Sequence, residues 1–124
     1  MIKERENLMN EAMNIAVNEL IEAIKTDYFD FLTRMGEREP STYAKEQMDT
    51  FYDKIEVRPG NKYIKIIKDR SVWGFIVNTE NDKKFRKGDL LKAASWAAPA
   101  RNAARGNILD GGYCIQWTGP LYLK

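Results

Sequence analysis

The spacing of the apolar residues changes once along the chain, near Arg58–Asn61. Before this segment, apolar residues recur at steps of three and four, the period of an amphipathic helix. After it, short runs rich in β-branched and aromatic residues indicate strands. Helices that precede strands are typical of the α+β class. The order predicts two N-terminal helices packed on a small, mostly antiparallel sheet of three to five strands, with a short helix inserted before the last strands.

The helical part divides into two segments. The first is expected to end near Gly36, and its pattern allows a break near Thr26–Asp27, because threonine can cap a new helix. Its apolar stripe consists of Met9, Met13, Ala16, Leu20, Ile24, Tyr28, Phe31 and Met35. The second segment begins at Ser41–Thr42, continues through Ile55 and ends before Pro59–Gly60, which suit the centre of a type II turn.

The strand-forming part begins with a hairpin, in which Tyr63–Lys68 and Val72–Val77 flank a turn at Asp69–Arg70. The second of these runs is apolar on both faces, which predicts a central strand covered on both sides. The further expected elements are a short strand within Phe85–Leu91, a short helix from Pro99 to Arg105, a strand over Tyr113–Thr118 and an edge strand at Leu121–Leu123.

Charge divides the chain in the same way as the apolar pattern. The 124 residues fit a single domain, with a helical acidic half over 1–58 and a β-rich basic half over 62–124. Residues 1–61 hold 8 Lys and Arg against 13 Asp and Glu, a net charge of −5, whereas residues 62–124 hold 12 against 5, a net charge of +7. This asymmetry indicates either a half that binds polyanions or two surfaces that attract each other, within a monomer or across a dimer.

The composition argues against most catalytic chemistry. The chain has no histidine, and therefore lacks the commonest general base and metal ligand. Its one cysteine, Cys114, excludes an internal disulfide and is expected to be a packed, inert thiol in a strand. We predict no catalytic residue, no metal and no cofactor, and the sequence leans towards a protein that is not an enzyme without deciding the question.

A dense motif occupies the basic half. It runs over Lys87–Trp96, continues through Pro99–Asn102 and Ala104–Ile108, and closes with Trp117–Leu123. This pattern resembles small uncharacterised proteins of marine tailed phages over residues 62–124. The resemblance implies action in the cytoplasm of a bacterial host. A cytoplasmic location also agrees with the single cysteine, the charged N-terminus and the lack of an apolar run long enough to span a bilayer.

Basic and aromatic residues in this half suggest a nucleic-acid-binding surface as an alternative function. Bases stack on exposed aromatic rings, and cations follow the phosphates of a single strand. Trp73 and Trp117 lie in strand patterns and are expected in the core, which leaves Trp96 as the candidate for exposure. A helix over 99–105 would place Arg101 and Arg105 on the same face, because they are four residues apart. The candidate binding residues are Lys83, Lys84, Arg86, Lys87, Lys92, Trp96, Arg101 and Arg105.

A divalent-metal-dependent nuclease is a remote alternative. Asp69 at the end of one strand and Asp82-Lys83-Lys84 after the next resemble, in outline, carboxylates that hold Mg²⁺ beside a lysine that helps to activate water. The pattern is short, and Asp82 is expected in a turn.

The favoured hypothesis is a small, non-enzymatic binding or accessory protein that acts through protein–protein contacts. Its partner would be another protein or a second copy of the chain. The first helix has a wide apolar face, and methionine-rich faces adapt readily to partners, so this helix is the expected surface for a dimer.

Overall fold

The computed structural model describes residues 9–120, which begin with a long helix, α2 (Glu11–Thr33), of 23 residues. The side chain of Asn10 accepts a 2.8 Å hydrogen bond from the backbone N–H of Met13 and caps the helix. This contact satisfies one of the donors that the first turn leaves unpaired. The helix runs without a break at Thr26–Asp27, and it buries the part of the apolar stripe from Met13 to Tyr28, whereas Phe31 and Met35 are exposed.

The first helix ends slightly before the predicted stop. Arg34 adopts the left-handed conformation (φ 51°) and closes α2 two residues before Gly36. A second helix, α3 (Thr42–Asp49), then begins at Ser41, whose hydroxyl accepts a 3.1 Å hydrogen bond from the backbone N–H of Ala44. The predicted start of the second helix at Ser41–Thr42 is therefore confirmed.

The prediction that the second helix continues through Ile55 is wrong. After α3 the chain makes one 3₁₀ turn, η1 (Tyr52–Lys54), and enters the strand β1 (Ile55–Pro59). Apolar and charged residues alternate within β1, and this period of two suits a half-exposed strand. Gly60 follows without the positive φ that a type II turn requires at this position, so the predicted turn type is wrong as well.

The predicted hairpin forms the centre of the main sheet. It consists of β2 (Tyr63–Lys68) and β3 (Ser71–Val77), joined through Asp69–Arg70. With β1 and the short β4 (Leu90–Leu91), these strands make a four-stranded antiparallel sheet in the order β1-β2-β3-β4. The register shifts once, and Trp73 is the extra residue of this bulge. The predicted α+β class and mostly antiparallel sheet are confirmed.

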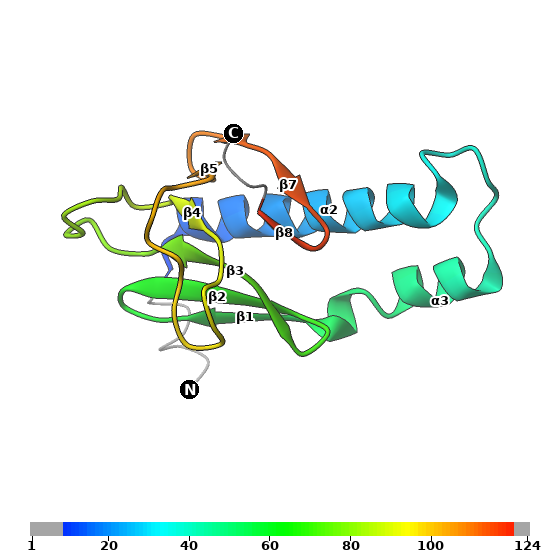
Figure 1. Ribbon diagram of the computed structural model, residues 1–124, viewed down its shortest axis with the longest axis horizontal. Coiled ribbons are helices and arrows are strands. Elements are labelled where there is room, and N and C mark those ends of the chain that lie inside the picture. Colours follow the sequence, from blue (N-terminus) through cyan, green and yellow to red (C-terminus); the bar gives the residue numbers. More distant parts are fainter. Residues whose placement is uncertain (1–8, 121–124) are drawn as a thin grey trace.

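Apolar side chains cover both faces of β3, as its sequence predicts. On one face α2 lies along the sheet (Figure 1) and buries Met13, Leu20 and Ile24 among side chains that include Ile64 and Ile76. On the other face a smaller cluster consists of Phe75, Val77, Phe85 and Leu91. The segment after β3 supplies part of this second cluster, and the course of this segment over the sheet positions the candidate site.

The predicted helix from Pro99 to Arg105 does not form. Pro99 pairs with Ala93 in an isolated antiparallel bridge, and the backbone N–H of Ala100 donates a 2.7 Å hydrogen bond to the carbonyl of Lys92. Proline has no N–H and is compatible with this edge position. The segment is therefore an extended loop that folds back on itself, although its alanine content suits a helix.

Short strands form the last part of the described residues: β5 (Gly106–Asn107) pairs with β6 (Gly112–Tyr113), and β7 (Ile115–Gln116) pairs with β8 (Gly119–Pro120). The predicted strand over Tyr113–Thr118 is thus interrupted. Cys114 lies at the interruption and is exposed, so the prediction of a packed thiol is wrong. The predicted edge strand at Leu121–Leu123 lies outside the described residues.

The hairpin turn offers a test of the fold. Asp69 and Arg70 both have positive φ, 51° and 67°, as a type I′ turn requires, and arginine carries a steric cost there that glycine does not. We expect Arg70→Gly to stabilise the protein by about 1 kcal/mol, measured by urea unfolding. Arg70→Ala retains the cost and serves as the control. Destabilisation by the glycine variant would contradict this backbone geometry.

Candidate functional site

Trp96 is displayed on the outside of the sheet. A tight turn carries it, in which the backbone N–H groups of Ala94 and Ser95 donate hydrogen bonds of 3.0 and 3.1 Å to the carbonyl of Ala98. Trp96, the sequence's candidate for exposure, is 49% exposed. Of the other two tryptophans, Trp73 is buried and Trp117 is half-buried.

Two cations from neighbouring strands approach the exposed indole. The ammonium group of Lys65 lies 4.5 Å from the centroid of the Trp96 ring, and the guanidinium group of Arg58 lies 5.6 Å from it. Arg58 and Lys65 are directly opposite each other in the β1–β2 register. Arg58 also forms an ion pair with Glu56, so part of its charge is balanced. We call Arg58, Lys65 and Trp96 the Trp96 face.

The sequence analysis missed Arg58 and Lys65 as site residues. They lie far from Trp96 in the chain, and the contact exists only because the loop after β4 crosses the outside of β1 and β2. One available signal was the alternation in β1 and β2, which sets charged residues between the apolar ones. What could not be read from the sequence was the course of the loop that brings the tryptophan to them.

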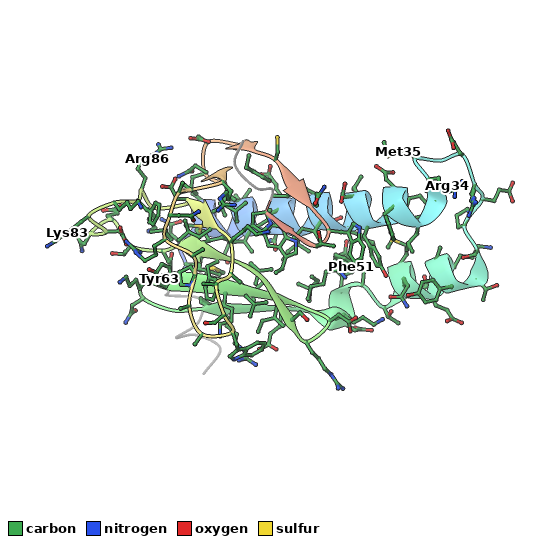
Figure 2. The ribbon with its side chains drawn as sticks, viewed as in Figure 1. Arg34, Met35, Phe51, Tyr63, Lys83 and Arg86 are labelled. Carbon is green, nitrogen blue, oxygen red and sulfur yellow. The ribbon has the colours of Figure 1, made fainter. Side chains whose placement is uncertain are left out.

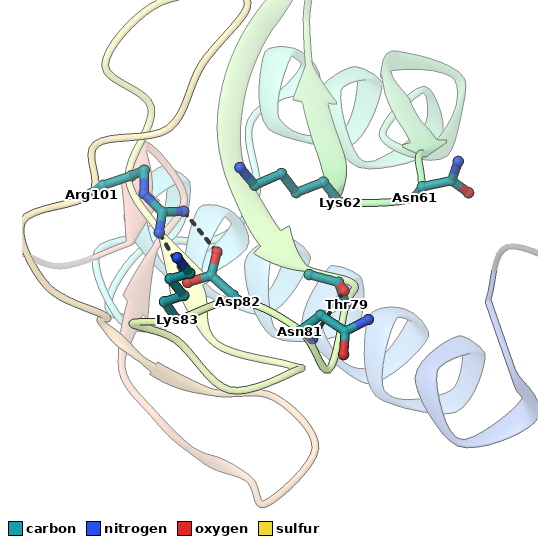
Figure 3. Close-up of a pocket in the computed structure, with 7 residues that line it drawn as sticks. All are labelled: Asn61, Lys62, Thr79, Asn81, Asp82, Lys83 and Arg101. Carbon is teal, nitrogen blue, oxygen red and sulfur yellow. Dashed lines mark hydrogen bonds and ion pairs between the residues drawn. The ribbon is translucent and has the colours of Figure 1, made fainter.

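A pocket of about 500 Å³, lined by polar and charged residues, lies at the end of the sheet where β3 leaves it. Three segments meet there: the loop between β1 and β2, the loop after β3, and the segment that carries Arg101 (Figure 3). We call it the Arg101 pocket; its lining residues are Asn61, Lys62, Thr79, Asn81, Asp82, Lys83 and Arg101.

A bidentate ion pair between Arg101 and Asp82 stabilises the Arg101 pocket. The two terminal nitrogens of Arg101 each donate a 2.9 Å hydrogen bond to one carboxylate oxygen of Asp82. Asp82 also accepts hydrogen bonds of 2.8 and 3.0 Å from the backbone N–H groups of Lys84 and Phe85. Arg101 first, and then these two amides, lower the pKa of Asp82 far below its usual value, and the carboxylate correspondingly raises the pKa of Arg101.

The predicted binding residues do not form one surface. Lys83 and Arg101 line the pocket, and Trp96 stands on the neighbouring face. Lys84 holds the loop, since its ammonium group donates to the carbonyls of Arg101 (2.6 Å) and Asn102 (2.8 Å).

The remaining predicted residues lie elsewhere. Lys87 is half-buried, and Lys92 donates to the carbonyl of Pro120 at 3.4 Å. Arg86 pairs with Asp110 at 3.1 Å on the surface, and Figure 2 shows Arg86 and Lys83 projecting from the same loop, at the end of the molecule opposite α3. Arg105 is 8% exposed, so the predicted shared face of Arg101 and Arg105 is wrong. The reason is that the helix they required does not form.

The carboxylates of the nuclease hypothesis are also separate. Asp69 lies in the turn before β3, whereas Asp82 follows the far end of that strand and is bonded to Arg101. Within residues 9–120, no group of three or more histidine, cysteine, aspartate or glutamate side chains is arranged to hold a metal ion.

A second surface lies at the C-terminal end of α2, where a groove of about 760 Å³ runs beside Phe31, Met35 and Trp117. Phe31 and Met35 are exposed, and the rings of Phe31 and Trp117 lie 4.9 Å apart. Asp27 fixes this contact by accepting a 2.8 Å hydrogen bond from the backbone N–H of Trp117. We call it the α2-end groove; charged residues of both signs also line it, namely Asp30, Arg34 and Arg38.

Fold and surface together define an α+β protein with a basic aromatic face on the outside of its sheet. The chain belongs to a family of unknown function (DUF7717), whose model matches residues 1–123. No curated protein and no solved structure matches the chain. Among the described helices, none combines the length and the hydropathy that crossing a bilayer requires.

The ion pair in the pocket predicts a pH-dependent stability. Because the pKa of Asp82 is lowered, its contribution to folding is present above the ordinary value of 3.8 and is lost as the pH falls further. We expect Asp82→Asn to lower Tm near neutral pH, and the difference from the unmodified protein to shrink steadily below about pH 4. Thermal unfolding followed by circular dichroism measures both, with the exposed Asp53→Asn as control. A difference that stays constant with pH would contradict the ion pair.

Proposed function

We propose that this protein binds single-stranded nucleic acid through the Trp96 face. The observation that carries the proposal is an exposed tryptophan beside Lys65 and Arg58, on the outside of a sheet. A base can stack on the open part of the indole, because every base has a flat apolar face, and the adjacent phosphates can approach the two cations. The position of Trp96 within the basic half of the chain supports this arrangement.

The proposal specifies a single strand and not a duplex. In a duplex the base faces are stacked on each other, so a protruding tryptophan has no base to stack on. Proteins that recognise duplex DNA usually insert an α-helix or a two-stranded β-ribbon into a groove. The Trp96 face consists of a loop tip on the broad side of a sheet, which suits unpaired bases better. Because residues 62–124 resemble phage proteins, we propose that the target is a nucleic acid in a bacterial host.

Binding is tested with fluorescently labelled single strands of DNA and RNA, and with the matching duplexes, by anisotropy over a range of salt concentrations. We expect Trp96→Ala to weaken single-strand binding about tenfold or more, the loss of one stacked base. Lys65→Gln should weaken binding and reduce the dependence on salt, because one fewer counterion is released.

Phe31→Ala is the matched control, since it also removes an exposed aromatic side chain but from the distant α2-end groove. The Phe31→Ala variant should bind single strands with the same affinity as the unmodified protein. Absence of single-strand binding at low salt, or equal losses from Phe31→Ala and Trp96→Ala, would overturn the proposal.

Self-association through the α2-end groove is a second candidate, in keeping with the expectation of a protein partner. The groove combines exposed apolar groups, Phe31 and Met35, with the opposite charges of Asp30 and Arg38. A two-fold contact requires a surface that complements itself, and a patch with apolar groups and charges of both signs meets that requirement. A second copy of the chain is therefore the occupant we propose.

Light scattering after size exclusion, over a range of protein concentrations, tests this candidate. We expect a concentration-dependent dimer, and we expect Phe31→Glu to raise its dissociation constant about tenfold or more by burying a charge. Ile15→Glu, at another exposed position of α2, is the control. A monomer at all concentrations would exclude this contact.

A further inference from the structure

We propose that the Arg101 pocket binds the terminal phosphate of the strand that lies on the Trp96 face. This inference rests on the proposed function and goes beyond it by specifying strand ends as the preferred ligand. The group recognised is a phosphate monoester, and we propose that it belongs to the end of a nucleic-acid strand.

Charge is the first argument. The Arg101 pocket is lined by Lys62, Lys83 and Arg101 against a single carboxylate, Asp82. Among residues 9–120, no carboxylate forms an ion pair with Lys62 or Lys83, whereas Arg101 is paired with Asp82. The lining therefore has two positive charges in excess. A terminal phosphate monoester carries a charge of about −1.5 to −2 near neutral pH, whereas an internal phosphodiester carries only about −1.

Rigid placement is the second argument. Asp82 fixes the guanidinium group of Arg101 and the backbone of the loop in one arrangement, and Lys84 fixes the carbonyl of Arg101 from the outside. Arg101 and the loop backbone are thus already held in place beside the pocket, so binding of a ligand there requires little further ordering of the loop. Asn61 and Asn81 add neutral side-chain donors to the lining.

Continuity with the Trp96 face is the third argument. Arg101 donates a hydrogen bond to the hydroxyl of Tyr63, whose ring lies 6.0 Å from that of Phe75. The ammonium group of Lys65 lies 5.8 Å from the centroid of Phe75 and 4.5 Å from that of Trp96. Lys65 of the Trp96 face and Arg101 of the pocket thus contact the same apolar cluster, which places the two sites on one side of the sheet, and we propose that one nucleic-acid strand occupies both. The pocket lies at the end of the sheet where β3 leaves it, and we propose that the nucleic-acid strand terminates there.

The test compares oligonucleotides of one sequence that carry a phosphate at the 5′ end, at the 3′ end, or at neither. We expect one phosphorylated form to bind about fivefold or more tightly than the form with two hydroxyl ends. Lys62→Gln combined with Lys83→Gln should abolish this preference. Lys45→Gln combined with Arg70→Gln removes the same charge at exposed positions outside the pocket and should preserve it. Trp96→Ala should weaken every form while the preference remains.

The pH dependence provides an independent readout. The second pKa of a phosphate monoester is about 6, and the histidine-free chain has no side chain that ordinarily titrates between about pH 5 and 7.5. The preference should therefore decrease as the pH falls through this interval.

Each outcome of the comparison decides the inference. Equal affinity for phosphorylated and hydroxyl ends would overturn it and leave single-strand binding in place, whereas binding of no strand would overturn both. A nucleoside monophosphate that binds the pocket as tightly as the phosphorylated strand would identify a free nucleotide as the ligand and would also overturn the inference.

Discussion

The packing of α2 on one face of the β2–β3 hairpin is the interaction on which the rest of the structure depends. Met13, Leu20 and Ile24 are fully buried along the helix, and burial of each such side chain is worth about 1.5–3 kcal/mol before the opposing entropy. A single helix can cover only one face of a sheet, and β3 is apolar on both. The other face must therefore be covered by the chain that follows β3. In this way one packing contact determines where the long C-terminal loops have to run.

That second face is covered by irregular chain held mostly through polar contacts. Phe85 and Leu91 supply apolar cover, but Lys84 and the pair of Asp82 with Arg101 fix the course of the loop. Because these contacts fix the loop that carries Trp96, the turn at its tip can be exposed to solvent and still keep its position. The same contacts that complete the core thus display Trp96 and shape the pocket beside it, which links the folding of the sheet to both proposals.

Periodicity predicted the regular parts of this fold and failed where the chain is irregular. The long helix and the hairpin around Asp69–Arg70 follow from local patterns that repeat over many residues. Ile55–Pro59 is too short for its period to be distinguished from the end of a helix. The segment from Pro99 to Arg105 has helical composition, but hydrogen bonds to distant backbone groups keep it extended. The site depends on such long-range pairings, so the sequence offered Trp96 as a candidate for exposure and Lys83 and Arg101 as candidate binding residues, but not the way in which they are arranged.

The charge asymmetry of the sequence is reproduced only in part on the two sides of the sheet. Arg58 of the acidic half lies beside Trp96, and Lys68 of the basic half lies over Tyr28 on the helix side. Exposed glutamates, among them Glu11, Glu19 and Glu22, lie on α2, on one side, whereas Lys65 and Arg101 contact the apolar cluster of the other. The ion pairs formed among residues 9–120 each join groups of the same half, so direct pairing between the halves is not how these charges are used there. A molecule polarised in this way repels a polyanion from its helical side and attracts it to the other. If the proposed function holds, this distribution of charge would favour the approach of a strand to the side that carries Trp96 before any base reaches the indole.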